Sequence, residues 1–214
     1  MLLPIALDVA GKLCLVVGGG PVAARKARSL LECAAKVRVV APQLCETLET
    51  LRGQIEYSKR AFQPEDCAEC RLIFACTNQR EVNEQVAIEA RRLGLWCNIA
   101  DDSISSDFHG AATIRRGGMT IAISTNGGSP ALSKHLKAKI ESVVGDEYAQ
   151  LLELMSARRA TIEYSNAQFE RVVKWRAILE SDVLELLRRS EHEKAAQRVD
   201  EILNGNSVVN EPRA

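Results

Sequence analysis

Short apolar runs alternate with helical patterns through the first hundred residues of the chain. The runs have the length of β-strands and lie at residues 12–17, 36–41, 54–57, 71–76 and 95–100. Between them, apolar residues recur at helical spacing over residues 21–33, 43–52 and 80–93. This alternation predicts an α/β fold, a Rossmann-like parallel sheet covered by helices on both faces. The segment between the third and fourth runs is short and broken, so that crossover should be reduced.

The pattern changes after Asp107. The strand-like segments "ATIRR" and "MTIAIST" flank Gly117 and Gly118, which predicts an antiparallel hairpin with a glycine turn. A helix should follow, with Ser129 as its N-cap, Pro130 at its first position and Gly145 as its stop. Further helices are predicted over residues 146–204, where Leu151, Leu154, Met155 and Ile162 recur at helical spacing and predict one buried face. We therefore expect three parts, at residues 1–112, 113–145 and 146–214.

Composition narrows the class of protein. The chain has 214 residues, 46% of them hydrophobic, which is enough for a substantial core. Lys and Arg number 28, as do Asp and Glu, so the net charge gives no reason to expect nucleic acid or an anionic membrane as partner. No stretch reaches the roughly 18 apolar residues of a membrane span, and no signal peptide is recognisable at the start. The seven cysteines form an odd set, several within apolar runs, which fits a reducing cytoplasm.

A glycine-rich junction follows the first predicted strand. In "LVVGGGPVAARKA", Gly18, Gly20 and Ala23 form the pattern G-x-G-x-x-A between a strand and a helix. Gly18 permits a tight turn, Gly20 lets the backbone approach a pyrophosphate, and a small residue at position 23 lets the helix pack on the strand. Pro21 suits the first helical position, and the helix N-terminus favours an anion. The junction predicts a dinucleotide-binding site rather than a turn that only saves space.

One element of the usual dinucleotide site is missing. The acidic residue expected at the end of the second strand, where it would bind the adenosine ribose, is replaced by Ala41, Pro42 and Gln43. Backbone groups or Gln43 must hold the ribose instead. No Arg stands at this strand end to bind a 2′-phosphate, so the residues leave the choice between NAD and NADP open.

Two further groups of residues are candidates for chemistry. The segment "NIADD" puts Asn98, Asp101 and Asp102 at the end of the fifth strand, where a carboxylate could accept a proton or could simply cap the next turn. Residues 108–140 contain no Asp or Glu but several basic side chains: Arg115, Arg116, Lys134, Lys137 and Lys139. This strip suits a polyanionic ligand, although a solvated helix face would have the same composition.

Several motifs in order resemble one family. "VVGGGPVAARKARSLL", "VVAP", "ACTNQREVN", "CNIADD" and "MTIAISTNGGSPALSKHLKAKIE" are similar to segments of precorrin-2 dehydrogenase, the first module of sirohaem synthases, which also occurs as a separate enzyme. The resemblance extends over residues 1 to about 145. The glycine motif and the "AISTNGGSPAL" motif are specific in combination, because ordinary Rossmann dehydrogenases lack the second.

The resemblance implies NAD-dependent oxidation of precorrin-2 to sirohydrochlorin by a homodimer, with residues 113–145 supplying the dimer contact. It assigns the catalytic aspartate to Asp101. It also implies a set of cofactor contacts beyond the glycines: Pro21, Val22, Ala41, Pro42, Gln43 and Thr77. Precorrin-2 carries eight carboxylates, so Arg115, Arg116 and Lys134 are the expected substrate-binding residues. Thr125 stands where some sirohaem synthases have a phosphorylated serine.

Two alternatives remain open at this point. The protein could combine dehydrogenase and ferrochelatase activity, or it could be a non-catalytic NAD-sensing module. No dedicated metal site is predicted, because Cys67 and Cys70 form a single C-x-x-C pair that we interpret as packing. A sensing module would usually keep the acidic ribose residue and would not need a basic strip, so oxidation is the favoured hypothesis.

Overall fold

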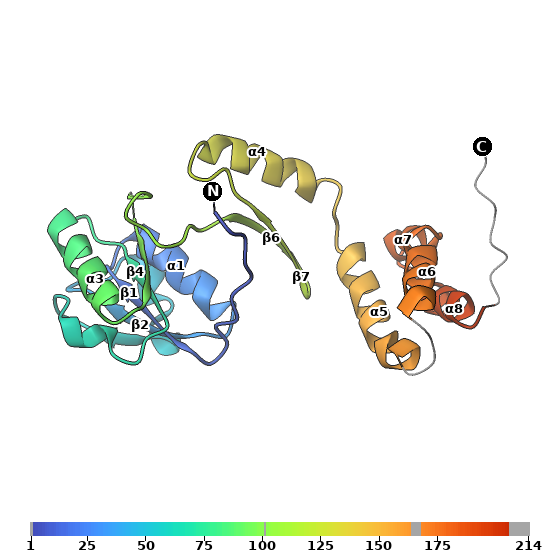
Figure 1. Ribbon diagram of the computed structural model, residues 1–214, viewed down its shortest axis with the longest axis horizontal. Coiled ribbons are helices and arrows are strands. Elements are labelled where there is room, and N and C mark those ends of the chain that lie inside the picture. The colour runs from blue at the N-terminus through green and yellow to red at the C-terminus, as the bar shows by residue number, and fades with distance from the viewer. Residues whose placement is uncertain (1, 101, 164–167, 206–214) are drawn as a thin grey trace. The chain divides into compact units, whose positions relative to one another are not determined.

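The computed structural model describes residues 2–100, 102–163 and 168–205. The chain divides into two compact units, Met1–Gly110 and Ala111–Ala214. The first contains the parallel sheet, and the second contains the hairpin and the remaining helices (Figure 1). Division of the second unit at residue 145 stays a prediction.

The first unit is built on five parallel strands: β1 (Leu13–Val17), β2 (Lys36–Val40), β3 (Glu56–Ser58), β4 (Leu72–Ala75) and β5 (Trp96–Ile99). Their order in the sheet is β3-β2-β1-β4-β5, so the strand order reverses between β1 and β4. Register pairs Val17 with Val40 on one side and with Ala75 on the other. The carboxyl ends of β1, β2 and β4 are therefore level, and the segments that follow them meet at one edge. The predicted Rossmann-like fold is confirmed.

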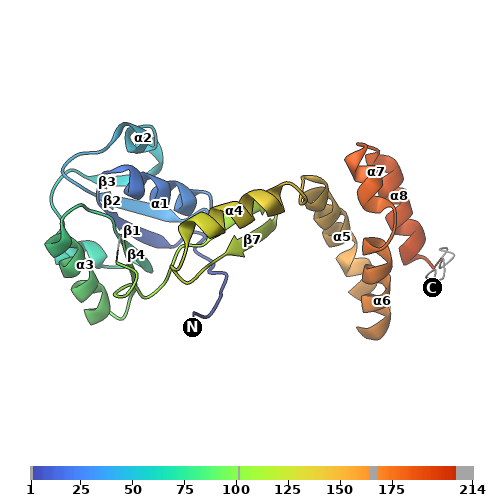
Figure 2. The same cartoon turned by 90° about the horizontal axis from the view of Figure 1, so that it is seen from above.

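Helices cover both faces of this sheet because strand side chains alternate between two cores. Helix α1 (Pro21–Leu31) packs three alanines and Leu30 on the face formed by Val16, Val39 and their neighbours. Helix α3 (Arg80–Arg92) packs Val86, Ala87 and Ala90 on the opposite face (Figures 1 and 2). The small residues on both helices allow close approach to the strands.

The connection after β2 differs from the prediction. Instead of one helix over residues 43–52, the chain forms the short α2 (Glu46–Glu49) and a 3-10 turn, Arg52–Gln54. The first residues of the predicted helix are not helical: Cys45 is extended, and its backbone N–H donates to the carbonyl of Gly19 at 2.7 Å. The segment before α2 is thus tied to the glycine junction instead of being helical.

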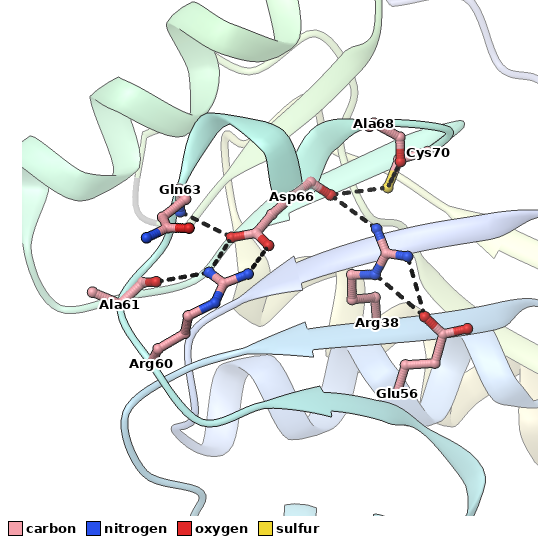
Figure 3. Close-up of polar contacts among 8 residues, drawn as sticks. All are labelled: Arg38, Glu56, Arg60, Ala61, Gln63, Asp66, Ala68 and Cys70. Carbon is pink, nitrogen blue, oxygen red and sulfur yellow. Dashed lines mark hydrogen bonds and ion pairs between the residues drawn. The ribbon is translucent and has the colours of Figure 1, made fainter.

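The crossover from β3 to β4 is reduced to the 3-10 helix Pro64–Cys67, as expected. Asp66 is its buried anchor: the carboxylate accepts hydrogen bonds from the guanidinium of Arg60 at 2.5 and 2.8 Å and from the backbone N–H of Gln63 at 2.8 Å (Figure 3). The backbone carbonyl of Asp66 accepts from Arg38, which also pairs with Glu56 of β3. This polar network fixes a connection that has no full helix to pack.

In the second unit, β6 (Ala112–Arg116) and β7 (Met119–Ile123) form the predicted antiparallel hairpin. Helix α4 (Pro130–Glu141) begins as expected, since the hydroxyl of Ser129 accepts a hydrogen bond from the N–H of Leu132 at 3.1 Å. The prediction of its end was wrong. The helix is capped at Ser142 and not at Gly145, because Val143 and Val144 both donate to the carbonyl of Ile140 and close a tighter turn.

The rest of the second unit is helical, as predicted: α5 (Glu147–Glu163), α6 (Gln168–Leu179), α7 (Val183–Arg188) and α8 (His192–Leu203). Their core contains Leu151, Ile178, Val183 and Val199, with Leu154 and Met155 packed against it. The predicted buried face of α5 is confirmed for Leu151, Leu154 and Met155. The side chain of Ile162 lies outside the described residues.

Candidate dinucleotide-binding site

The three segments after β1, β2 and β4 interlock at the carboxyl edge of the sheet. We call residues 18–20, 41–45 and 76–79 the three-loop cradle. Gly18 is buried and has φ +128°, a conformation that favours glycine. A Cβ at this position would lie 2.5 Å from the carbonyl oxygen of Cys76, and the Gly18 N–H donates to Val40 at 2.9 Å. The predicted role of Gly18 in a tight turn is confirmed.

Gly19 is a residue that the sequence pattern missed. A Cβ at position 19 would lie 1.8 Å from the backbone carbonyl oxygen of Gln43 and 3.1 Å from the side chain of Ala41. The carbonyl of Gly19 also accepts the hydrogen bond from Cys45. The G-x-G-x-x-A pattern allows any residue at the middle position. The only sign of this constraint in the sequence is therefore that a glycine also occupies that position.

Gly20 and the start of α1 have the form of an anion site. No atom lies within 4 Å of the position that a Cβ on Gly20 would occupy, so this side of the turn is open. Gly20 is the N-cap of α1 without a side-chain cap, Pro21 takes the first position, and no acidic residue stands in the first turn. The N–H groups of Val22 and Ala23 lack intrahelical partners by helix geometry. The site therefore fits a dinucleotide pyrophosphate.

Asn83 of α3 holds the third segment of the cradle. Its side chain is buried and contacts Thr77 three times: Oδ1 accepts from the backbone N–H at 3.1 Å and lies 2.8 Å from the hydroxyl, and Nδ2 donates to the carbonyl at 3.0 Å. The Thr77 hydroxyl also accepts from the N–H of Gln79. Thr77 thus shapes the loop beside Gly18, and its direct contact with a cofactor stays a prediction.

The segment after β2 has the exposure expected of a ribose-binding edge. Ala41 is buried, whereas Pro42 and Gln43 are exposed. The backbone of Gln43 packs on Gly19, so the side chain of Gln43 projects from a segment that is fixed relative to the glycine turn. The roles of Val22, Ala41, Pro42 and Gln43 in cofactor binding stay predictions.

The segment after β5 resolves part of the "NIADD" ambiguity. Asp101, the predicted catalytic residue, lies outside the described residues. Asp102 caps the loop, because its Oδ1 accepts from the N–H groups of Ile104 at 3.1 Å and Ser105 at 3.0 Å. These hydrogen bonds, from Ser105 above all, lower the pKa of Asp102. Asn98 is buried and donates to the carbonyl of Phe108 at 2.8 Å, so its role is structural.

The predicted substrate-binding residues lie in the second unit. Arg115 and Arg116 are adjacent on β6, so their side chains leave opposite faces of the hairpin. Arg115 is exposed, whereas Nε of Arg116 lies 3.3 Å from the carbonyl oxygen of Val144 and 3.5 Å from the carboxylate of Asp146. Lys134 is exposed on α4. The strip is thus divided between two faces, and its role in binding stays a prediction.

The C-x-x-C pair of Cys67 and Cys70 offers neither a nucleophile nor a metal centre. Cys67 and Cys70 are buried, and burial raises their pKa to about 12 and about 11. Both values favour the inert thiol at neutral pH. Across residues 2–100, 102–163 and 168–205, the structure contains no group of three or more His, Cys, Asp or Glu side chains that could hold a metal ion.

The fold and the three-loop cradle define a Rossmann-like dinucleotide-binding protein. Sequence comparison agrees: the family described as "Putative NAD(P)-binding" matches residues 5–112, and the chain belongs to this family. A second family, described as "Sirohaem biosynthesis protein central", matches residues 116–142. These two matches together confirm the family resemblance seen in the motifs.

Curated relatives and solved structures extend the comparison. The chain is 32% identical to the siroheme synthase of Nitrosococcus oceani over 96% of its own length, and 33% identical to that of Chromobacterium violaceum over 92%. It spans only 45% and 42% of those proteins, less than half their length. The solved structure of SirC, a precorrin-2 dehydrogenase, is 26% identical with a TM-score of 0.75, and the match covers 94% of this chain and all of SirC.

Proposed function

We propose that this protein is an NAD-dependent dehydrogenase that oxidises precorrin-2 to sirohydrochlorin in sirohaem biosynthesis. The observation that supports this most is the match to SirC, which extends over both units and over the whole of that dehydrogenase. The siroheme synthases are matched over less than half their length, so the other activities of those proteins are not assigned to this chain.

The three-loop cradle would hold the cofactor. The open side of Gly20 and the first turn of α1 receive the pyrophosphate, and the segment Ala41–Gln43 meets the adenosine ribose through backbone groups and the Gln43 side chain. Bound NAD supplies the hydride acceptor. Neither an acidic residue nor an Arg stands at the end of β2, so the residues there do not decide between NAD and NADP. Titration with each cofactor measures the preference.

Oxidation of precorrin-2 removes two hydrogens, one as a hydride and one as a proton. The proton needs an acceptor beside the nicotinamide, and we assign this role to Asp101, which follows β5 in the sequence. Asp102 is occupied in capping the loop, so it is the matched control for Asp101. Arg115, Arg116 and Lys134 are the side chains that we assign to the eight carboxylates of the substrate.

The proposal is tested by mixing the purified protein anaerobically with precorrin-2 and NAD. Simultaneous appearance of NADH and of the sirohydrochlorin spectrum is expected, and absence of both would exclude the dehydrogenase function. Repeating the reaction with ferrous or cobaltous ion shows whether the protein also inserts metal. NADP in place of NAD measures the cofactor preference.

Asp101 is tested with paired variants. Asp101→Asn should reduce turnover by about a hundredfold or more with NAD affinity retained, as expected for loss of a positioned base. Asp102→Asn keeps an oxygen acceptor for the two loop N–H groups and should retain most of the activity. Equal losses in the two variants would indicate that the carboxylates only shape the loop.

We further propose a homodimer that works in the cytoplasm. Exposed Leu132, Leu136 and Val143 on and after α4 support an interface in the second unit, because such side chains gain from being covered. Five cysteines, Cys14, Cys45, Cys67, Cys70 and Cys97, are free thiols, which supports a reducing compartment. In the described part of the chain, no helix combines the length and apolarity needed to span a bilayer. Analytical ultracentrifugation of the wild type and of Leu136→Asp tests the dimer.

A further inference from the structure

Lys26 of α1 is a half-buried cation in an aromatic setting. Its ammonium lies 5.0 Å from the centre of the Phe74 ring, on the penultimate residue of β4. Phe108 packs edge-on against Phe74 with ring centres 5.3 Å apart. The position is also confined by Gly110, where a Cβ would approach Nζ of Lys26 to 3.2 Å. The ring of Phe74 and Gly110 therefore adjoin the ammonium, and Phe108 packs against that ring.

Hydrogen bonds hold the segment that packs beside Lys26. Asn98 of β5 donates to the carbonyl of Phe108 at 2.8 Å, and Asp107 and Cys97 pair through their backbones at 2.9 Å. These bonds bind residues 107–108 along β5 and bring the chain to Gly110 beside Lys26. The ammonium thus lies in a built position at a fixed distance from β4, unlike a lysine that projects freely into solvent.

No anion balances this charge among the described residues. Neither a carboxylate nor a hydrogen-bond acceptor lies within bonding distance of Nζ there. The ammonium contacts the ring face of Phe74, and it interacts electrostatically with Cys76. Burial lowers the pKa of Lys26 and outweighs the opposing effect of Cys76, while the neighbouring Arg25 acts in the same direction as burial. Removing an ammonium from water without a counter-ion is unfavourable, and a cation–π contact returns only part of that cost. Such a group is stabilised when a ligand brings the missing negative charge.

The position of Lys26 on the sheet indicates which ligand would bring the negative charge. The adenosine half of a dinucleotide lies over the end of β2, and the cofactor crosses the sheet where the strand order reverses, between β1 and β4. Lys26 lies over β4, which is on the nicotinamide half. The substrate must meet the nicotinamide there. The eight carboxylates of precorrin-2 are the anions that this half of the site would receive.

We propose that Lys26 forms an anion subsite for one carboxylate of the tetrapyrrole substrate, with Gly110 keeping the space that its ammonium needs. This inference rests on the proposed function, and it adds to the substrate-binding set a residue of the first unit that the basic strip of residues 108–140 does not contain. The phosphates of the cofactor are the competing source of negative charge, and NAD titration distinguishes them.

The test uses sirohydrochlorin, the octacarboxylate product, titrated onto the protein in the presence of NAD. Lys26→Met should weaken sirohydrochlorin binding about tenfold, the scale of one lost charge-assisted contact, with NAD affinity unchanged. Lys36→Met is the matched control, because Lys36 is an exposed lysine at the amino end of β2 and at the opposite edge of the sheet. This control should bind both ligands as the wild type does.

Two further measurements separate a binding role from a structural one. Lys26→Met should not lower the melting temperature of the unliganded protein, because the variant loses an unbalanced charge. Gly110→Ala keeps the charge but crowds Nζ, so it should also weaken sirohydrochlorin binding. Unchanged sirohydrochlorin affinity in Lys26→Met, or an equal loss of NAD affinity, would overturn the subsite. Oxidation of precorrin-2 by the wild type is scored separately, so failure of the dehydrogenase function would not be mistaken for failure of Lys26.

Discussion

The side-chain amide of Asn83 contacts the backbone N–H, the hydroxyl and the carbonyl of Thr77, all within 3.1 Å. One buried side chain on α3 thereby sets the conformation of the segment that packs against Gly18. This pair links the start of a helix on one face of the sheet to the glycine turn that begins the helix on the other face.

Replacing Asn83 should therefore damage cofactor binding without direct contact with the cofactor. Asn83→Leu removes all three contacts and leaves the N–H of Thr77 without its partner, so the free energy of unfolding should fall by about 1–3 kcal/mol. The KM for NAD should rise about tenfold, and kcat should fall less.

Steady-state kinetics and urea unfolding measure these effects. Gln85→Leu, an exposed position on the same helix, serves as the control. Thr77→Ser keeps the hydroxyl and should behave nearly as the wild type. If Asn83→Leu lost stability but kept its KM for NAD, Asn83 would be a purely structural residue.

The middle and last glycines of the junction should respond differently to alanine. In Gly19→Ala the new methyl group would meet the Gln43 carbonyl, and relief of that overlap should cost about 1–3 kcal/mol of stability. Gly20→Ala adds a methyl group to open space, so its melting temperature should stay close to that of the wild type while NAD affinity falls. Calorimetric unfolding and NAD titration compare the two. Similar melting temperatures for both would contradict the assigned packing of Gly19.

The sequence was sufficient to predict the features that depend on local pattern. Strands β1, β2, β4 and β5 are short, mostly buried runs, and the start of α4 depends on Ser129 and Pro130, which are neighbours in the chain. The alternation of runs and helices predicted the order of elements because parallel strands need crossovers between them. The same holds for Gly18, whose turn follows directly from its position after β1.

Features that depend on distant partners could not be predicted. The constraint on Gly19 arises from the carbonyl of Gln43, and the start of the predicted helix at residues 43–52 is altered by the neighbouring hydrogen bond from Cys45 to Gly19. Nothing in the local pattern indicates that Asn83 binds Thr77 or that Lys26 lies over Phe74. Adjacent residues of a strand project from opposite faces, so the sequence could have predicted that the side chains of Arg115 and Arg116 are separated. Their common positive charge led us to group them in one strip.

The ion pair between Arg60 and Asp66 should make stability depend on pH in the acid range. Burial alone would raise the pKa of Asp66, but hydrogen bonds from Arg60 and from the N–H of Gln63 outweigh it and lower the pKa below its ordinary value. When the pKa of a carboxyl group is lower in the folded state, the ionised form stabilises the fold. This stabilisation is complete at pH values above the pKa in the unfolded state, about 3.9, and is lost as the pH falls through the pKa in the folded state.

Asp66→Asn tests this dependence. At pH 7 it should destabilise the protein by about 1–2 kcal/mol, a moderate loss because the guanidinium of Arg60 is partly exposed and can be solvated. The difference from the wild type should be constant down to about pH 5 and should shrink below about pH 3.9. Urea unfolding across this range measures it. The control is Glu56→Gln, which replaces an exposed partner of Arg38 and should change stability by less than about 1 kcal/mol. If the loss of stability in Asp66→Asn did not depend on pH, the charge of Asp66 would not be responsible for it.

Arg115 and Arg116 should have separate effects although they are adjacent. Arg115 projects from one face of β6 and is exposed, so Arg115→Ala should raise the KM for precorrin-2 about tenfold, with little change in the KM for NAD. Arg116 contacts the carbonyl of Val144 and the carboxylate of Asp146, so Arg116→Ala should lower the free energy of unfolding by about 1 kcal/mol through loss of the contacts that hold the segment after α4. Its effect on the KM for precorrin-2 should be the smaller of the two. Kinetics and thermal unfolding of both single variants measure these effects. A larger effect of Arg116→Ala on the KM for precorrin-2 would place the substrate on the other face of the hairpin. Equal effects on the KM for precorrin-2 and the KM for NAD would remove these arginines from tetrapyrrole binding.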